Sequence, residues 1–207
     1  MEELIRAHKI IAILRNVPNE ILDSYVKCIY DAGIRMLEVA LNSENALKQI
    51  EWICSRYEGK LTVGAGTAIT PILAEKALCA GAQFVLSPSA DEDVLQYCCK
   101  NRLQLLPGVM TPSDVSLCLK YGYSTLKLFP AGDLPMGYAK SLKGPFSQTN
   151  YVAFGGVSPE NAESYFENGF IGVGIGSNLI PSPLLQEGKW DEAAQRIASL
   201  CEKVKKF

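Results

Sequence analysis

A lysine interrupts an apolar run of the sequence, Thr125–Pro130, that otherwise has the composition of a buried strand. In an extended chain Leu126 and Leu128 point to one side, whereas Lys127 points to the other. A buried cation is costly, so desolvation lowers the pKa of such a lysine and leaves part of its amine neutral. A neutral amine attacks carbonyl carbons, which makes Lys127 a candidate Schiff-base former. The alternative is a lysine near a strand end that reaches water or pairs with a carboxylate.

A glutamate takes the matching place in an earlier apolar run, Met36–Leu41. Leu37 and Val39 share one face of this run, and Glu38 lies on the other. We expect Glu38 to point inward, toward Lys127. There it is either the general acid–base partner that a Schiff-base enzyme needs or half of a buried ion pair.

Two further polar residues end predicted strands. Arg15 follows Ile10–Leu14, and a guanidinium there could clamp a carboxylate or a phosphate; the alternative is a rim arginine paired with an acid. Thr67 ends the run Val63–Thr67 and could donate to a carboxylate. The two glycines of that run, at 64 and 66, predict a close approach of the backbone to a ligand.

The elements that must position these residues alternate between strand and helix along the whole chain. A helix is predicted between most neighbouring strands, as in Ile21–Ala32, and residues 2–8 form a short leading helix. Ser43, Thr70, Thr111 and Ser158 are expected to begin helices as N-caps. Eight strands are predicted: Ile10–Arg15, Arg35–Leu41, Leu61–Thr67, Gln83–Ser89, Gln104–Val109, Ser124–Ala131, Tyr151–Val157 and Ile171–Asn178.

Eight such units with short loops predict an α/β fold, a (β/α)₈ TIM barrel with a short N-terminal helix, and residues 1–207 are expected to form one domain. An open doubly wound sheet is the alternative. In these barrels the loops after strands seven and eight often bind phosphate through backbone N–H groups and a helix N-terminus. Here those strands end in Gly155-Gly156 and Gly176-Ser177, so we expect a phosphate site. The alternative is a pair of tight turns without a ligand.

Composition excludes several classes of function. The 207 residues are 48% hydrophobic, and the net charge is −2 without blocks of like charge, so neither nucleic acid nor a membrane surface is an expected partner. Ile10–Leu14 is too short for a membrane span or a signal peptide, and the seven cysteines include no C-x-x-C pair, so we expect a cytoplasmic protein. With His8 as the only histidine, no metal site and no cofactor are expected.

Short motifs spread in order over most of the chain resemble the 2-keto-3-deoxy-6-phosphogluconate (KDPG) aldolase family, some members of which act on 4-hydroxy-2-oxoglutarate. The motifs are Leu37-Glu38-Val39, Gly64-Ala65-Gly66-Thr67, Gly81-Ala82-Gln83-Phe84, Ser87-Pro88, Pro107-Gly108-Val109, Lys127-Leu128-Phe129-Pro130-Ala131, Lys143-Gly144-Pro145-Phe146, Gly155-Gly156-Val157 and Gly176-Ser177.

The resemblance implies a class I, metal-independent lyase on a (β/α)₈ barrel, typically a homotrimer. Such an enzyme cleaves a phosphorylated 2-keto-3-deoxy sugar acid to pyruvate and glyceraldehyde 3-phosphate. By the same resemblance Lys127 matches the Schiff-base lysine and Glu38 the general acid–base. Arg15, Thr67, Phe154, Gly155, Gly156, Gly176 and Ser177 match the substrate site.

Two residues depart from the pattern of many family members. Asn42 stands where they have an arginine, and Phe154 stands where they have a threonine before the double glycine. Because the related 6-phosphogalactonate aldolases also lack that threonine, they remain an alternative. Two further alternatives are a phosphosugar isomerase or epimerase, with Glu38 as base, and a non-catalytic barrel that binds an anionic metabolite.

Overall fold

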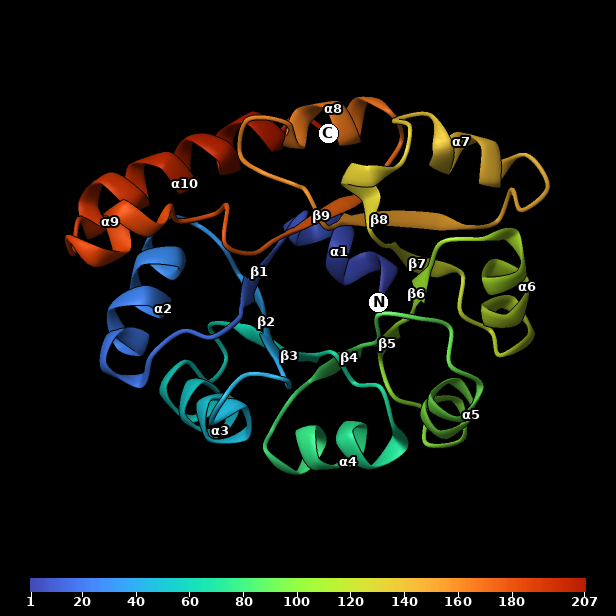
Figure 1. The fold of residues 1–207 in the computed structure, drawn as a ribbon, viewed down its shortest axis with the longest axis horizontal. Coiled ribbons are helices and arrows are strands. Elements are labelled where there is room, and N and C mark those ends of the chain that lie inside the picture. The colour runs from blue at the N-terminus through green and yellow to red at the C-terminus, as the bar shows by residue number, and fades with distance from the viewer.

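The computed structural model describes all 207 residues, and its parallel strands form a barrel surrounded by helices (Figure 1). The hydrogen-bonded order is β5-β4-β3-β2-β1-β9-β8-β7-β6. The strands are β1 (Ile10–Leu14), β2 (Met36–Ala40), β3 (Thr62–Gly66), β4 (Phe84–Leu86), β5 (Leu105–Leu106), β6 (Gly108–Val109), β7 (Thr125–Leu128), β8 (Asn150–Phe154) and β9 (Gly172–Ile175).

The two ends of this order meet at Pro107, so the nine strands occupy eight positions of a barrel. β5 pairs with β4, β6 pairs with β7, and the N–H of Lys127 donates to the carbonyl oxygen of Pro107 at 2.9 Å. Proline has no N–H to give to a sheet, which explains the break. The prediction of one strand over Gln104–Val109 was therefore wrong in detail, whereas the (β/α)₈ fold is confirmed.

A ring of helices surrounds the barrel in Figure 1, and the short helix at the N-terminus lies inside that ring in this view. A short helix leads the chain, as predicted. The helices are α1 (Glu2–His8), α2 (Leu22–Asp31), α3 (Ala46–Arg56), α4 (Pro71–Cys79), α5 (Glu92–Lys100), α6 (Pro112–Lys120), α7 (Tyr138–Lys143), α8 (Ala162–Glu167), α9 (Ser182–Gln186) and α10 (Trp190–Val204), with 3-10 turns η1 (Asn19–Ile21) and η2 (Ala131–Asp133).

Two of the four predicted N-caps are confirmed. The Thr70 side chain accepts from a backbone N–H of the first turn of α4, and Thr111 forms a capping box at α6. The prediction for Ser43 was wrong because α3 begins after Asn45, and the Ser43 hydroxyl instead accepts from the N–H of Asn16 at 2.9 Å. The prediction for Ser158 was also wrong, because α8 begins only at 162, after a loop.

The core has two layers that follow the alternation along each strand. Fifty-two buried residues, Leu37, Leu126 and Leu128 among them, fill the space between the barrel and the helices. A second cluster of nine lies inside the barrel, where Ile5 of α1 contributes at one end and Phe154 at the other. The outward residues of β2 and β7 are therefore apolar, as the sequence predicts, and their other face is left for the site.

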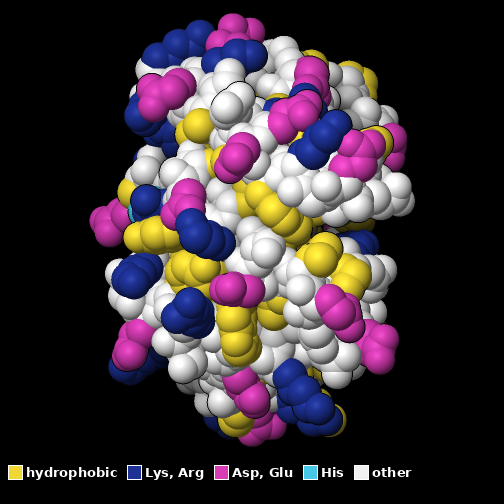
Figure 2. Space-filling model, turned by 90° about the vertical axis from the view of Figure 1, so that its left-hand side faces the viewer, with side chains coloured by type: hydrophobic (Ala, Val, Ile, Leu, Met, Phe, Trp, Pro, Cys, Tyr) yellow, Lys and Arg dark blue, Asp and Glu magenta, His cyan; other side chains and the backbone are white.

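The face seen in Figure 2 carries acidic and basic side chains interspersed, without an extended area of one sign. Exposed ion pairs, such as that of Lys27 with Asp31, also occur on the surface of the molecule. None of the helices combines the length and the apolar composition that crossing a membrane requires.

Candidate active site

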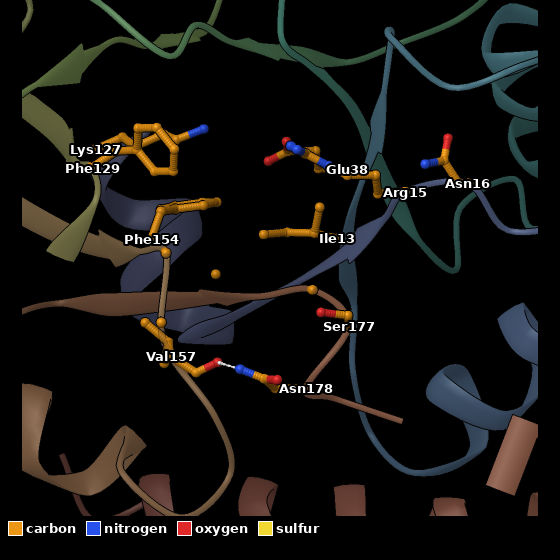
Figure 3. Close-up of a pocket in the computed structure, with 14 residues that line it drawn as sticks. Ile13, Arg15, Asn16, Glu38, Lys127, Phe129, Phe154, Val157, Ser177 and Asn178 are labelled. Atoms are coloured by element: carbon orange, nitrogen blue, oxygen red, sulfur yellow. Dashed lines mark hydrogen bonds between the residues drawn. The ribbon is translucent and has the colours of Figure 1, made fainter. Parts of the chain in front are cut away.

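A cavity of about 380 Å³ opens at the carboxyl ends of β1, β2, β7, β8 and β9 (Figure 3). In barrels of this kind that end carries the active site. Every predicted site residue except Thr67 lies in its wall. The lining residues are Ile13, Arg15, Asn16, Glu38, Lys127, Phe129, Phe154, Gly155, Gly156, Val157, Gly174, Gly176, Ser177 and Asn178.

Glu38 owes its place to a glycine on the neighbouring strand. Glu38 pairs with Gly64 in the register of β2 and β3, and its side chain lies over Gly66. A Cβ on Gly66 would lie 1.7 Å from Oε1 of Glu38, and a Cβ on Gly64 would lie 2.4 Å from the ring of Phe84. The close approach of this backbone to a ligand therefore stays a prediction. The two glycines make room for side chains inside the barrel.

Lys127 and Glu38 reach into the cavity from β7 and β2, and both are buried, with 6% and 1% of their surface exposed (Figure 3). Burial lowers the pKa of Lys127; Arg15 adds to this effect, and Glu38 opposes it. Burial also raises the pKa of Glu38, against the influence of Lys127 and Arg15. Both shifts favour the neutral forms, in which the amine is a nucleophile and the carboxyl can hold a proton.

Neither group is locked in an ion pair. The two side chains do not approach within the 4.0 Å of a salt bridge, and Oε2 of Glu38 is buried without a hydrogen-bond partner. An orphaned buried carboxylate oxygen is unfavourable, and such groups concentrate at functional sites. The alternative of a structural Lys127–Glu38 pair therefore loses support.

Arg15 lies at the mouth of the cavity and forms no ion pair with the protein. The alternative of a rim arginine paired with an acid is wrong for this structure, and the guanidinium is free to bind an anion. Thr67 lies just past β3 in the left-handed region, with φ 62°. That conformation is strained for a β-branched residue, and Thr67 is not in the cavity wall.

The loops after β8 and β9 offer donors to an anion. Gly155 and Gly156 have φ of 85° and 73°, values that favour glycine. The N–H groups of Gly156 and Ser177 donate to no acceptor in the protein. Helices α8 and α9 begin only at 162 and 182, so the loops themselves, and not a helix N-terminus, are the candidate phosphate site.

Six lining residues were not predicted. Ile13 and Phe129 share the strand parity of Arg15 and Lys127, and Gly174 shares that of Gly176, so alternation along the strands could have found them. Asn16, Val157 and Asn178 come from loops, where no periodicity applies. Neither in this cavity nor elsewhere in the structure do three or more histidine, cysteine, aspartate or glutamate side chains lie close enough together to hold a metal ion.

A buried, unpaired lysine and carboxylate at the carboxyl ends of the strands of a parallel barrel are what an enzyme that attacks a carbonyl carbon with an amine needs. The comparisons with known proteins agree. Residues 1–196 match the aldolase family described as KDPG and KHG aldolase, and the chain belongs to that family. It is therefore a lyase of the aldolase type.

Among its relatives, the KHG/KDPG aldolase of Escherichia coli strain K12 is 35% identical over 168 residues, 80% of this chain and 78% of that protein. The 2-dehydro-3-deoxy-6-phosphogalactonate aldolase of the same strain is 31% identical over 197 residues, 94% and 96% of the two chains. The structure of KDPG aldolase from Legionella pneumophila, with pyruvate captured as a covalent carbinolamine, superimposes with a TM-score of 0.87. That chain is 28% identical, and 96% of this chain and 97% of that one are covered.

Proposed function

We propose that this protein cleaves 2-keto-3-deoxy-6-phosphogluconate to pyruvate and glyceraldehyde 3-phosphate by class I aldolase chemistry. The observation that carries the proposal is the cavity in which Lys127 and Glu38 are both buried, both shifted toward their neutral forms and not paired with each other. Family membership favours this reaction over the isomerase, the epimerase and the non-catalytic barrel.

The chemistry follows from the positions of these groups. The lone pair of neutral Lys127 Nζ attacks the C2 carbonyl, protonated Glu38 gives its proton so that the carbonyl oxygen leaves as water, and an iminium and the Glu38 carboxylate result. Glu38, directly or through water, takes the proton of the C4 hydroxyl. The C3–C4 bond then breaks, its electron pair passes to the iminium, and the aldehyde leaves. The resulting enamine is protonated at C3 and hydrolysed to pyruvate and free amine.

The remaining wall of the cavity is proposed to hold the ends of the substrate. Arg15 binds the carboxylate from this wall, Thr67 donates to it from its position just past β3, outside the wall, and Phe154 limits the space beside the reacting carbons. The N–H groups of Gly155, Gly156, Gly176 and Ser177, with the Ser177 hydroxyl, bind the phosphate. Support comes from the free guanidinium of Arg15 and from the unpaired amides of the two loops.

Borohydride reduction in the presence of pyruvate tests the proposal directly. The parent protein is expected to gain one reduced pyruvyl group, located on Lys127 by peptide mass spectrometry. Lys127→Ala serves as the matched control and should gain none. A parent protein that stays unmodified, or that is modified on another lysine, would contradict the mechanism.

A second candidate substrate is the phosphogalactonate epimer. The relative that acts on it, by its name, aligns over more of both chains than the KHG/KDPG aldolase does. Phe154 and Asn42 also stand where many KDPG aldolases have threonine and arginine. The two epimers differ at C4 and give the same products, so each must be supplied in pure form. The ratio of their kcat/KM values then decides between the two assignments.

We further propose that residues 1–207 form one domain, that three copies assemble, and that the enzyme works in the cytoplasm. One barrel and one main core account for the whole chain. Support for assembly comes from a 28% identical chain, TM-score 0.85, in a protein cage designed by fusing symmetric oligomeric domains, with 96% of this chain and 72% of that chain covered. Light scattering coupled to size exclusion should give a mass three times that of one chain.

A further inference from the structure

The reacting nitrogen has an unusual set of neighbours. Nζ of Lys127 forms no hydrogen bond and no ion pair within 4.0 Å. It lies instead 4.6 Å from the ring centroid of Phe154 and 5.3 Å from that of Phe129. The face of an aromatic ring is negative and attracts a cation at such distances, more strongly where water is excluded.

The two rings are not equivalent. Phe154 is 1% exposed, whereas Phe129 is 39% exposed, so only Phe154 acts from within a desolvated wall. Its position depends on Gly174 of the adjacent strand, where a Cβ would lie 2.1 Å from the Phe154 ring. Phe154 and Gly174 face each other in the register of β8 and β9. The Phe154 ring therefore occupies the space that the absence of a side chain at Gly174 leaves, and it lies there beside Lys127 (Figure 3).

We propose that the ring face of Phe154 stabilises the positive charge that Lys127 Nζ acquires when it becomes the iminium. This inference rests on the proposed function. Free Lys127 must be neutral to attack, and the nitrogen becomes cationic once the carbonyl oxygen has left as water. A neutral amine gains little from the ring and the iminium gains much, so the contact acts on the intermediate more than on the resting enzyme.

The same contact shapes the titration of Lys127. Glu38 and Arg15 are the charged groups that face it, and the ring adds an attraction for the protonated amine to that of Glu38. Weakening the ring should therefore lower the pKa of Lys127 further. The limb of the pH–rate profile that reports its deprotonation should then move to lower pH, although the iminium itself becomes less stable. A ring that only fills space would change neither.

Fluorination tests this because fluorine atoms weaken the negative ring face while the shape changes little. Site-specific incorporation of 4-fluoro-, 3,5-difluoro- and 3,4,5-trifluorophenylalanine at 154 gives a graded series. We expect the pyruvate concentration for half-maximal borohydride trapping to rise with each fluorine, by about tenfold at the trifluoro step, which corresponds to about 1.4 kcal/mol, because the contact with the ring is desolvated. Phe154→Leu, which removes the ring, should show at least the same loss.

The matched control is the same series at Phe84, which belongs to the same inner cluster and packs on Gly64. We expect no trend there. A flat response at 154, or equal trends at both sites, would overturn the inference. Failure of the parent to be trapped would instead contradict the proposed function. In that event NMR titration of Lys127 decides the inference separately, because its pKa must still fall along the series.

Discussion

The place of Glu38 over Gly66 makes Gly66→Ala an informative substitution. The added methyl carbon would lie 1.7 Å from Oε1 of Glu38, half of the 3.4 Å at which ordinary contact begins. The carboxylate must therefore move. A misplacement of about 1 Å in a catalytic group can cost about 100-fold in rate, which corresponds to about 2.7 kcal/mol of the barrier. We expect kcat to fall by about this factor.

The assay is cleavage of the phosphorylated substrate with pyruvate detected by lactate dehydrogenase, normalised to the folded fraction from a urea titration. Overpacking should also cost about 1–3 kcal/mol of the free energy of unfolding. Gly64→Ala is the matched control, since its methyl group would meet the Phe84 ring and not the carboxylate. It should lose similar stability while folded molecules keep most of their activity.

A double variant decides whether the loss passes through Glu38. Glu38→Gln alone should slow turnover by about 100-fold or more, the usual size of a general acid–base contribution. Adding Gly66→Ala to Glu38→Gln should lower kcat little further, because the carboxylate that the methyl group would displace is already absent. Multiplicative losses, or equal losses in Gly64→Ala and Gly66→Ala, would refute the reasoning.

Three further outcomes are expected. Lys127→Met should abolish turnover and raise the free energy of unfolding at pH 7. Because burial lowers the pKa of Lys127 in the folded state below its unfolded value, the lysine destabilises the parent protein until the pH exceeds about 10.5. The difference in the free energy of unfolding between variant and parent should therefore vanish above that pH. The phosphorylated substrate should exceed its unphosphorylated analogue by at least about tenfold in kcat/KM. Gly176→Asp should erase that preference, whereas Gly176→Asn should not, because a Cβ at 176 would meet Ile13 only at ordinary contact distance, 3.7 Å, and only aspartate carries charge. Equal preference in the two variants would contradict a phosphate site there. Activity should survive exhaustive treatment with EDTA, and a loss reversed by a divalent ion would place the enzyme in another aldolase class.

The repeat of strand and helix was enough to predict the barrel, and alternation along the strands was enough to predict the inward positions of Lys127 and Glu38. Each strand has one apolar face against the helices, and a charged residue on the other face must point into the barrel. Packing between strands was not accessible in this way. The sequence does not show that Gly64 and Gly66 face Phe84 and Glu38, because that depends on the register of β2, β3 and β4.

Loop geometry was also out of reach. A serine followed by an acidic residue, as in Ser43-Glu44, has the composition of an N-cap, yet the Ser43 hydroxyl accepts from the N–H of Asn16 in the loop after β1. The site residues Asn16 and Asn178 follow strand ends without a pattern that distinguishes them from other loop residues. Asn178 is held by the bond from its amide to the carbonyl oxygen of Val157, a contact between two loops far apart in the sequence.

The break in the barrel at Pro107 also bears on how the strand with the nucleophile moves. On one side, all four residues of β7 pair with the five-residue strand β8. On the other side, β7 pairs with the two-residue strand β6, and the N–H of Lys127 donates to the carbonyl oxygen of Pro107. Local opening begins where few hydrogen bonds hold a segment. Hydrogen exchange at the Lys127 amide should then be faster than at the amides of β8. The strand that carries the nucleophile, where a covalent intermediate must form and break, is therefore expected to be less constrained than its neighbour β8.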